Sequence, residues 1–168
     1  MSQAVTLRLD DTITGAIQDL INVLHGPPPT YPPHITLTLG RKTPDIEDAR
    51  ARLARVAAHT DALSLSVSGF GIFPDGHGWL WLAPVTTPSL LALQAEVAEI
   101  IGLDSLDPHY HPGAWQPHIT IERGATPIPD ALSPLMHAWK GSLHGFAVRL
   151  EIVRFPPVTV VAGLPLRP

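Results

Sequence analysis

One string occurs twice in this sequence, and the repeat constrains the fold more than any other feature. Pro-His-Ile-Thr stands at 33–36 and again at 117–120, each time followed by an aliphatic residue. The two histidines, His34 and His118, lie half a chain length apart in a chain of 168 residues. Such a repeat can arise by chance, from a structural duplication, or because the two copies form the halves of one catalytic site.

Each copy of the repeat is expected to open a β-strand. Residues i and i+2 of a strand point to the same face, so His34 and Thr36 should project together. The same holds for His118 and Thr120. The proline before each histidine cannot donate a hydrogen bond to a sheet and therefore fits at the strand entrance. Each histidine would then lie at the mouth of a sheet, where a ligand can reach it.

Hydrophobic periodicity predicts the other elements. Gly26 is expected to end the first helix, Thr43-Pro44 to begin the second, and 74–76 to form a turn, while the glycines of 69–71 should break a strand. The predicted strands lie at 4–9, 35–39, 63–67, 79–83, 119–122, 146–152 and 158–161, and the predicted helices at 13–24, 44–57, 88–101 and 134–140.

The order of these elements is similar in the two halves of the chain. Each half has a strand, a capped helix and then a strand that opens with Pro-His-Ile-Thr, which favours an α+β domain of two similar lobes. With 45% hydrophobic and 15% charged residues, 1–168 is expected to form a single domain with its own core. If a pseudo-twofold axis relates the lobes, the two His-Thr pairs face each other across a cleft.

Composition excludes several classes of protein. The chain has no cysteine, which excludes disulfides, thiolate nucleophiles and cysteine-ligated metal centres. A net charge of −4 argues against a protein that grips long nucleic acid through its phosphates, although a short RNA end needs only a few donors. The sequence shows neither a secretory signal nor an apolar run near 18 residues, so we expect a cytoplasmic protein with no membrane partner.

Two imidazoles on opposite sides of a phosphorus atom can share one in-line displacement. An imidazole with its ordinary pKa of about 6.5 takes or gives a proton at neutral pH. One ring would remove a proton from the attacking water or hydroxyl, and the other would protonate the departing oxygen, each step being worth about 10²- to 10⁴-fold in rate. Threonine hydroxyls would donate to the non-bridging phosphate oxygens. This arrangement requires no metal, but the residues alone leave a purely structural repeat open.

With these motifs in place, the sequence resembles the 2H phosphoesterase superfamily, in its 2′-5′ RNA ligase-like and cyclic phosphodiesterase branch. That family is named for two His-x-Thr/Ser motifs, matched here at 34–36 and 118–120. The likeness runs over about residues 4 to 124. Further similar strings are the one around the first motif at 32–40, the glycine- and phenylalanine-containing strand at 69–73, and the approach to the second motif at 110–118.

The resemblance implies a two-lobed, pseudo-symmetric fold in which antiparallel sheets line a central cleft and helices lie outside. It implies metal-independent and cofactor-free cleavage or ligation at 2′,3′-cyclic phosphates or 2′-5′ phosphodiester linkages. The expected partner is a nucleotide or an RNA end, not DNA, and the expected state is a monomer. Carried onto this sequence, His34 and His118 are the acid/base pair, Thr36 and Thr120 hold the phosphate, and Arg123 adds a charged donor.

The first motif departs from the family pattern at one position. Thr38 stands where many relatives have a lysine or an arginine, which leaves the contact to a second substrate phosphate open. Two aromatic residues beside the second motif, Tyr110 and Trp115, either stack on a nucleobase or pack the strand entrance. Four others are expected in the core, with one of the phenylalanines reaching the cleft: Phe70, Phe73, Trp79 and Trp81.

Two other functions compete with a phosphoesterase. A non-catalytic module would keep the same cleft to hold a nucleotide or RNA end. A metal-dependent hydrolase would use His109 and His111, which have strand spacing and acidic neighbours at Asp104 and Asp107. The sequence places no third ligand for that metal, so a polar loop is the preferred interpretation of these residues.

Overall fold

The computed structural model describes residues 2–24, 30–40, 46–73, 78–124 and 127–168. The expected helix end at Gly26, the helix start at Thr43-Pro44 and the turn at 74–76 lie outside these residues. The helices are α1 (Asp11–Asn22), α2 (Ile46–His59), α3 (Pro88–Ile101) and α4 (Ile128–Ala138). The strands are β1 (Ser2–Leu9), β2 (His34–Gly40), β3 (Leu63–Phe73), β4 (Trp79–Pro84), β5 (Ile119–Arg123), β6 (Leu143–Phe155) and β7 (Thr159–Pro165).

The strands form an antiparallel sheet in the order β2-β1-β6-β3-β4-β5, with β7 paired to β6. The order of strand, helix and motif strand occurs twice along the chain, as β1-α1-β2 and as β4-α3-β5. Strand β6 lies beside β1 in the first group, and strand β3 lies beside β4 in the second. The predicted α+β class is confirmed, and the pairing of β3 with β6 joins the two groups into one continuous sheet.

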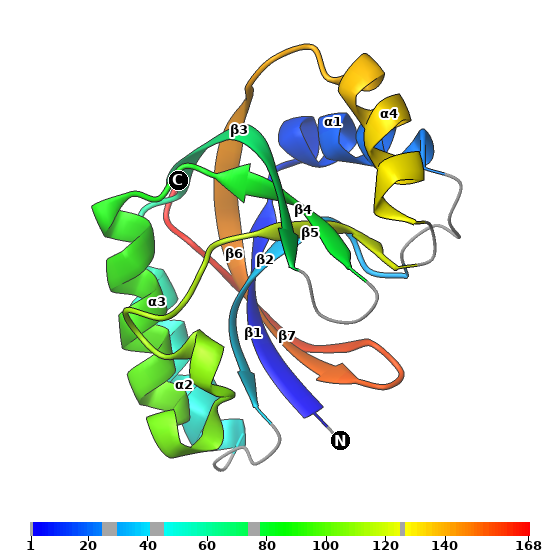
Figure 1. The fold of residues 1–168 in the computed structure, drawn as a ribbon. Helices are drawn as coiled ribbons and strands as arrows, with labels where there is room; N and C mark the ends of the chain where they lie inside the picture. Colours follow the sequence, from blue (N-terminus) through cyan, green and yellow to red (C-terminus); the bar gives the residue numbers. More distant parts are fainter. Residues whose placement is uncertain (1, 25–29, 41–45, 74–77, 125–126) are drawn as a thin grey trace.

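The helices lie in two pairs, with α2 and α3 on one side of the molecule and α1 and α4 near the opposite end (Figure 1). Helix α1 begins at Asp11, because the Asp10 carboxylate caps it by accepting a hydrogen bond from the backbone N–H of Ile13 at 3.0 Å. The same carboxylate accepts from the backbone N–H of Phe146 in β6, which fixes the helix to the sheet. No helix in the described parts of the chain is both long and apolar enough to cross a membrane.

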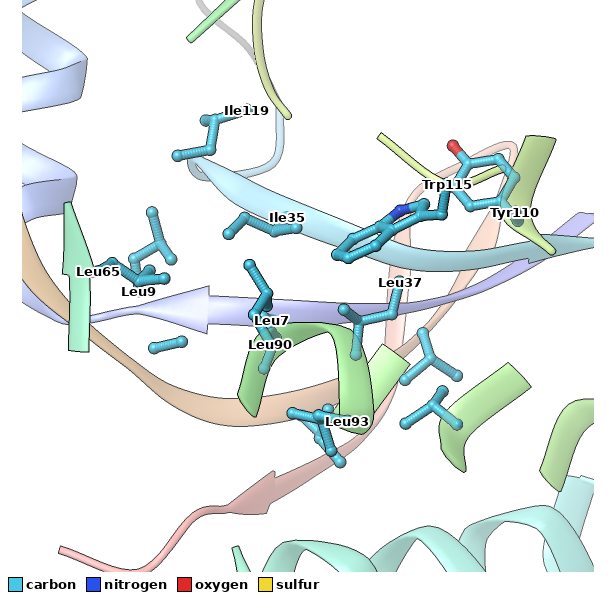
Figure 2. Packing of buried hydrophobic residues seen from close by; sticks show 14 of the residues in the cluster. Leu7, Leu9, Ile35, Leu37, Leu65, Leu90, Leu93, Tyr110, Trp115 and Ile119 are labelled. Carbon is cyan, nitrogen blue, oxygen red and sulfur yellow. The ribbon is translucent and has the colours of Figure 1, made fainter. Parts of the chain in front are cut away.

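The core forms where the apolar faces of the motif strands meet the helices. Ile35 and Leu37 of β2 are fully buried, as are Leu7 of β1 and Leu90 of α3. Figure 2 shows these side chains directed toward one another, with Ile119 from the second motif above Ile35. Burying a side chain of this size contributes about 1.5–3 kcal/mol, so the residue between histidine and threonine in each motif anchors its strand.

Several boundaries differ from the sequence-based expectation, and those of β3 and α4 differ most in their physical origin. Strand β3 continues through 69–71 to Phe73, because Gly71 leaves room for the indole of Trp81, which a Cβ atom at this position would overlap. Helix α4 starts at Ile128, six residues before Pro134, and Pro134 lies inside it. The prolines at the start of the helix are Pro127, at the N-cap, and Pro129, in the first turn, whereas Pro134 leaves the helix without one backbone donor.

Candidate active site

The two motif histidines are held in the same way. Nδ1 of His34 lies 2.8 Å from the carbonyl oxygen of Pro32, and Nδ1 of His118 lies 2.8 Å from the carbonyl oxygen of Gln116. A carbonyl oxygen only accepts hydrogen bonds, so Nδ1 carries the proton and donates in both rings. In a neutral ring this leaves a lone pair on Nε2, and in a protonated ring it leaves an Nε2–H donor. In each histidine, Nε2 is therefore the ring nitrogen that remains for another partner.

A β-bulge follows the threonine of the first motif. Thr36 lies opposite Thr6 of β1, whereas Thr38 lies opposite Val5, so Leu37 is the extra residue on β2. The bulge turns the Thr38 side chain toward the core, where only 1% of its surface is exposed. Thr38, which stands where many relatives have a cationic residue, is therefore buried and does not share a face with His34 and Thr36.

The second motif has a bulge at the equivalent place. Thr120 lies opposite Trp81 and Arg123 lies opposite Trp79, with the register shift between Leu80 and Trp81. Simple alternation would put residues i and i+3 on opposite faces, but the extra residue brings Arg123 to the face of Thr120. We call this face, which carries the side chains of Thr36 and Thr120, the site face.

The two motif strands lie side by side, although β2 and β5 are at opposite ends of the sheet order. They cross the centre of the molecule together in Figure 1. One direct link joins them, because the indole N–H of Trp115, three residues before His118, donates to the carbonyl oxygen of Thr36 at 3.0 Å. The bend of the sheet therefore brings together two motifs that are half a chain apart.

Electrostatics also place both histidines in one neighbourhood. The pKa of His34 is lowered to about 4, chiefly by burial and also by the positive charges of Arg123, His118 and Arg8, whereas the hydrogen bond to Pro32 acts to raise it. Burial likewise lowers the pKa of His118, as does the charge of Arg123. One arginine acts on both rings, so the candidate acid/base groups and the candidate phosphate donor share a site.

We expect an NMR titration to give the His34 imidazole a pKa near 4. Because this lies below the unfolded value of about 6.5, the unfolded chain binds more protons between these pH values. The stability contribution is complete above pH 6.5 and is lost as the pH falls toward 4, on the order of 3 kcal/mol. The His34→Gln variant should lack this loss in acid-unfolding measurements. A titration midpoint at or above 6.5 would contradict the buried environment of the ring.

Three aromatic residues of the second lobe lie on the site face. Phe73 contacts the His118 ring edge-on, with ring centroids 5.0 Å apart, and stacks on Trp81 at 5.0 Å. The guanidinium of Arg123 lies 5.1 Å over the ring of Trp79. The expectation that Trp79 and Trp81 belong to the core is therefore wrong, because their strand parity turns them toward the site. Phe73 is the phenylalanine that reaches it, whereas Phe70 packs against the core and the ring of Trp139.

Tyr31 holds the other side of His34. Its ring contacts the imidazole at 4.6 Å between centroids. Its hydroxyl donates to the Glu151 carboxylate and lies 2.9 Å from the hydroxyl of Thr6. Burial and the bond to Glu151 raise the pKa of Tyr31 above its ordinary range. The phenol therefore stays protonated and fixes the His34 ring against β1 and β6.

Tyr110 and Trp115 are both buried, with 6% and 7% of their surface exposed. Their side chains lie over β2 beside Leu37 (Figure 2). Burial raises the pKa of Tyr110 to about 12. Packing of the strand entrance, rather than stacking on a nucleobase, is the interpretation that this burial favours.

Gln94 was not identified from the sequence, yet it links the surroundings of both motifs. Its side-chain amide donates to the carbonyl oxygens of Tyr110 at 2.7 Å and Leu37 at 3.3 Å. Only 1% of its surface is exposed. A signal was present, since Gln94 is a polar residue on the face of α3 that carries Leu90 and Val97.

The alternative metal site at His109 and His111 gains no support from its surroundings. No group of three potential His, Asp or Glu ligands occurs among the residues that the structure describes. His109 is exposed and packs on Tyr110 at 4.4 Å. Nε2 of His111 is buried without a hydrogen-bond partner in the described structure. These two side chains therefore have different environments, one exposed and one with a buried ring nitrogen.

Comparison with known proteins identifies the family. A family model described as the 2′-5′ RNA ligase superfamily matches residues 9–155, which is most of the chain and includes both motifs. The chain belongs to this superfamily. No protein with a curated description matches its sequence.

Several solved structures align with nearly the whole length of this member of the 2′-5′ RNA ligase superfamily. The protein TT0787 of Thermus thermophilus has a TM-score of 0.67 at 21% identity, with 99% of this chain and 98% of that chain covered. E. coli LigT in complex with NADP+ has a TM-score of 0.66 at 15% identity, with 99% and 98% covered. A structure described as a phosphoesterase gives 0.68 at 15% identity, with 99% of both chains covered. At these identities the similarity concerns the fold.

Proposed function

We propose that this protein is a metal-independent phosphoesterase that acts on 2′,3′-cyclic phosphates or 2′-5′ phosphodiester linkages of nucleotides or RNA ends. The observation that carries the proposal is the matched state of the two histidines. Nδ1 of His34 and Nδ1 of His118 each donate to the carbonyl two residues earlier, which leaves both Nε2 atoms available. Two such rings in one neighbourhood supply an acid and a base without a metal ion.

In the proposed reaction, the attacking group is a water molecule and the bond that breaks joins phosphorus to a ribose oxygen of the cyclic ester. A pKa near 4 keeps the His34 ring neutral at neutral pH, so we assign His34 as the base that takes the proton of the water. His118 then donates its Nε2 proton to the departing ribose oxygen. The product is a nucleoside monophosphate, and the two histidines end in exchanged protonation states.

The remaining predicted residues would stabilise the charge on the phosphate. Thr36 and Thr120 would donate hydroxyl hydrogen bonds to non-bridging oxygens, and Arg123 would add a charged pair of donors. The position of all three side chains on or beside the site face supports these roles. Trp79 lies under the guanidinium of Arg123 and would keep it oriented.

A nucleotide substrate is supported by what related structures contain. E. coli LigT has been solved in complex with 3′-AMP, with ATP and with phosphate. We extend nucleotide binding to the present chain as part of the proposal. The net charge of −4 fits a substrate bound locally by a few donors better than a long nucleic acid.

The purified protein is expected to open 2′,3′-cyclic nucleotides in the presence of EDTA. In the free protein the pKa values of both histidines are lowered, and one ring must be protonated for the reaction. The maximum of kcat/KM is therefore expected below pH 6.5, because kcat/KM reports the free enzyme. A bound anionic phosphate raises both pKa values, so the profile of kcat should lie at higher pH than that of kcat/KM.

This experiment separates the phosphoesterase from its alternatives. Complete inhibition by the chelator, restored by added zinc or manganese, would replace the two-histidine reaction with a metal-dependent one. Binding of 3′-AMP without turnover of 2′,3′-cyclic nucleotides or 2′-5′-linked dinucleotides would identify a non-catalytic nucleotide-binding module.

A further inference from the structure

A row of side chains crosses the sheet from the first motif, and two of them are arginines. Residues directly opposite each other in an antiparallel pair share a face. Arg8 of β1 lies opposite His34, and Arg149 of β6 lies opposite Arg8. Neighbouring strands are about 4.8 Å apart, so the backbones of Arg8 and Arg149 are about 5 and 10 Å from that of His34. The row extends the site face with positive charge.

The guanidinium of Arg8 has hydrogen-bond donors that no residue in the described ranges uses. Its side chain is partly buried, and it makes no hydrogen bond or ion pair with any residue in the described ranges. Its charge nevertheless reaches the neighbouring groups, because it contributes to the lowered pKa of His34 and opposes the rise in the pKa of Tyr31. A guanidinium has five N–H donors in a rigid fork, so Arg8 offers an anion a full set of contacts beside the candidate base.

Arg149 is held in place by its neighbours. Its Nε lies 3.2 Å from a Glu151 carboxylate oxygen, and the other oxygen of Glu151 accepts from Tyr31. The aliphatic part of the Arg149 side chain lies over Gly163 of β7, where a Cβ atom would come within 3.2 Å of it. Glu151 balances one of the two arginine charges, so the group Arg8, Arg149 and Glu151 keeps a net positive charge.

We propose that Arg8, assisted by Arg149, forms a second phosphate-binding subsite next to His34, for a substrate phosphate other than the one that reacts. This inference rests on the phosphoesterase proposed above and names its substrate class. The preferred substrates are 2′,3′-cyclic nucleotides that also carry a 5′-phosphate, free or as the phosphodiester to a preceding nucleotide. Arg8 supplies, from the adjacent strand, the cation that the buried Thr38 does not supply.

Three substrates and two variants test the subsite. The substrates are a 2′,3′-cyclic nucleotide without a 5′-phosphate, the same nucleotide with a free 5′-phosphate, and a dinucleotide that ends in a 2′,3′-cyclic phosphate. Arg8→Gln is expected to lower kcat/KM about 10- to 100-fold more for a substrate with the second phosphate than for the first one. Arg154→Gln is the matched control, because Arg154 is on β6 but opposite Gln3, on the other face of the sheet.

Comparison of the three substrates shows which form of the 5′-phosphate the subsite binds. A selective loss with both larger substrates means that the subsite takes a 5′-phosphate in either form, and a selective loss with one of them assigns it to that form. An equal loss for all three substrates, or a loss of the same size in Arg154→Gln, would overturn the subsite.

A binding measurement keeps this test separate from the proposed reaction. If none of the three substrates is turned over, the proposed function fails, but calorimetry with nucleoside 3′,5′-bisphosphate and nucleoside 3′-monophosphate still examines the subsite. The wild-type protein should bind the bisphosphate about tenfold or more tightly than the monophosphate, and Arg8→Gln should remove most of that difference. Equal affinities in the wild-type protein would reject a second phosphate site.

Discussion

Replacement of His34 or of His118 by alanine is expected to remove nearly all turnover of a 2′,3′-cyclic nucleotide. Each ring would carry one proton transfer, and loss of such a group typically costs about 10²- to 10⁴-fold in rate. The loss should fall on kcat more than on KM, because the imidazoles act on protons that move only in the transition state. Steady-state kinetics with each single variant and with the double variant measures this directly.

The control for these variants is His59→Ala. His59 is an exposed histidine at the end of α2, with its Nδ1 2.8 Å from the carbonyl oxygen of Arg55, and its replacement should leave the rate unchanged. The double variant is expected to be little worse than either single variant, since residues that act as a unit are strongly non-additive. Full activity in either His34→Ala or His118→Ala would reject the two-histidine mechanism.

Gln94→Leu is expected to destabilise the protein by about 2–5 kcal/mol. The side-chain amide of Gln94 donates to two carbonyl groups, those of Leu37 and Tyr110, from a position that is almost fully buried. Leucine fills a similar volume but cannot donate, so both carbonyls lose this partner. Thermal unfolding should show a fall in Tm of about 5 to 15 °C, given about 2–4 °C per kcal/mol for a protein of this size.

Gln18→Leu provides the comparison for this variant. Gln18 bonds to Asn22 at 3.1 Å on an exposed part of α1, so its loss should change the stability by less than about 0.5 kcal/mol. An equal Tm for Gln94→Leu and the wild-type protein would show that the amide of Gln94 has no part in holding the two motif regions together.

The elements that carry the motifs were predictable from sequence because their signals are local. Alternating side chains identified β2 and β5, and the apolar spacing of Leu90, Leu93 and Val97 identified α3. The i, i+2 rule also placed His34 and Thr36 correctly, since both precede the bulge. These predictions required only the period of a strand or a helix.

Features that depend on pairing between distant strands were not predictable. The register that puts Arg8 opposite His34, and the bulges that turn Thr38 inward and bring Arg123 to the site face, arise from contacts across the sheet. The wrong assignment of Trp81 to the core has the same origin. The hydrophobicity of a tryptophan in a strand predicts a core position. The face on which Trp81 lies is instead decided by the pairing of β4 with β3 and by the space above Gly71.

Strand β2, which carries the first motif, is an edge strand of the sheet. An edge strand usually exposes unpaired backbone groups that can pair with other chains. Here the carbonyl oxygens of Thr36, Leu37 and Leu39 accept hydrogen bonds from groups outside the sheet. Their donors are the Trp115 indole, the Gln94 amide and the backbone N–H of Asp107. The outer rim of β2 is thus closed to strand addition, and contacts that set the position of the first motif also protect the chain from edge-to-edge aggregation.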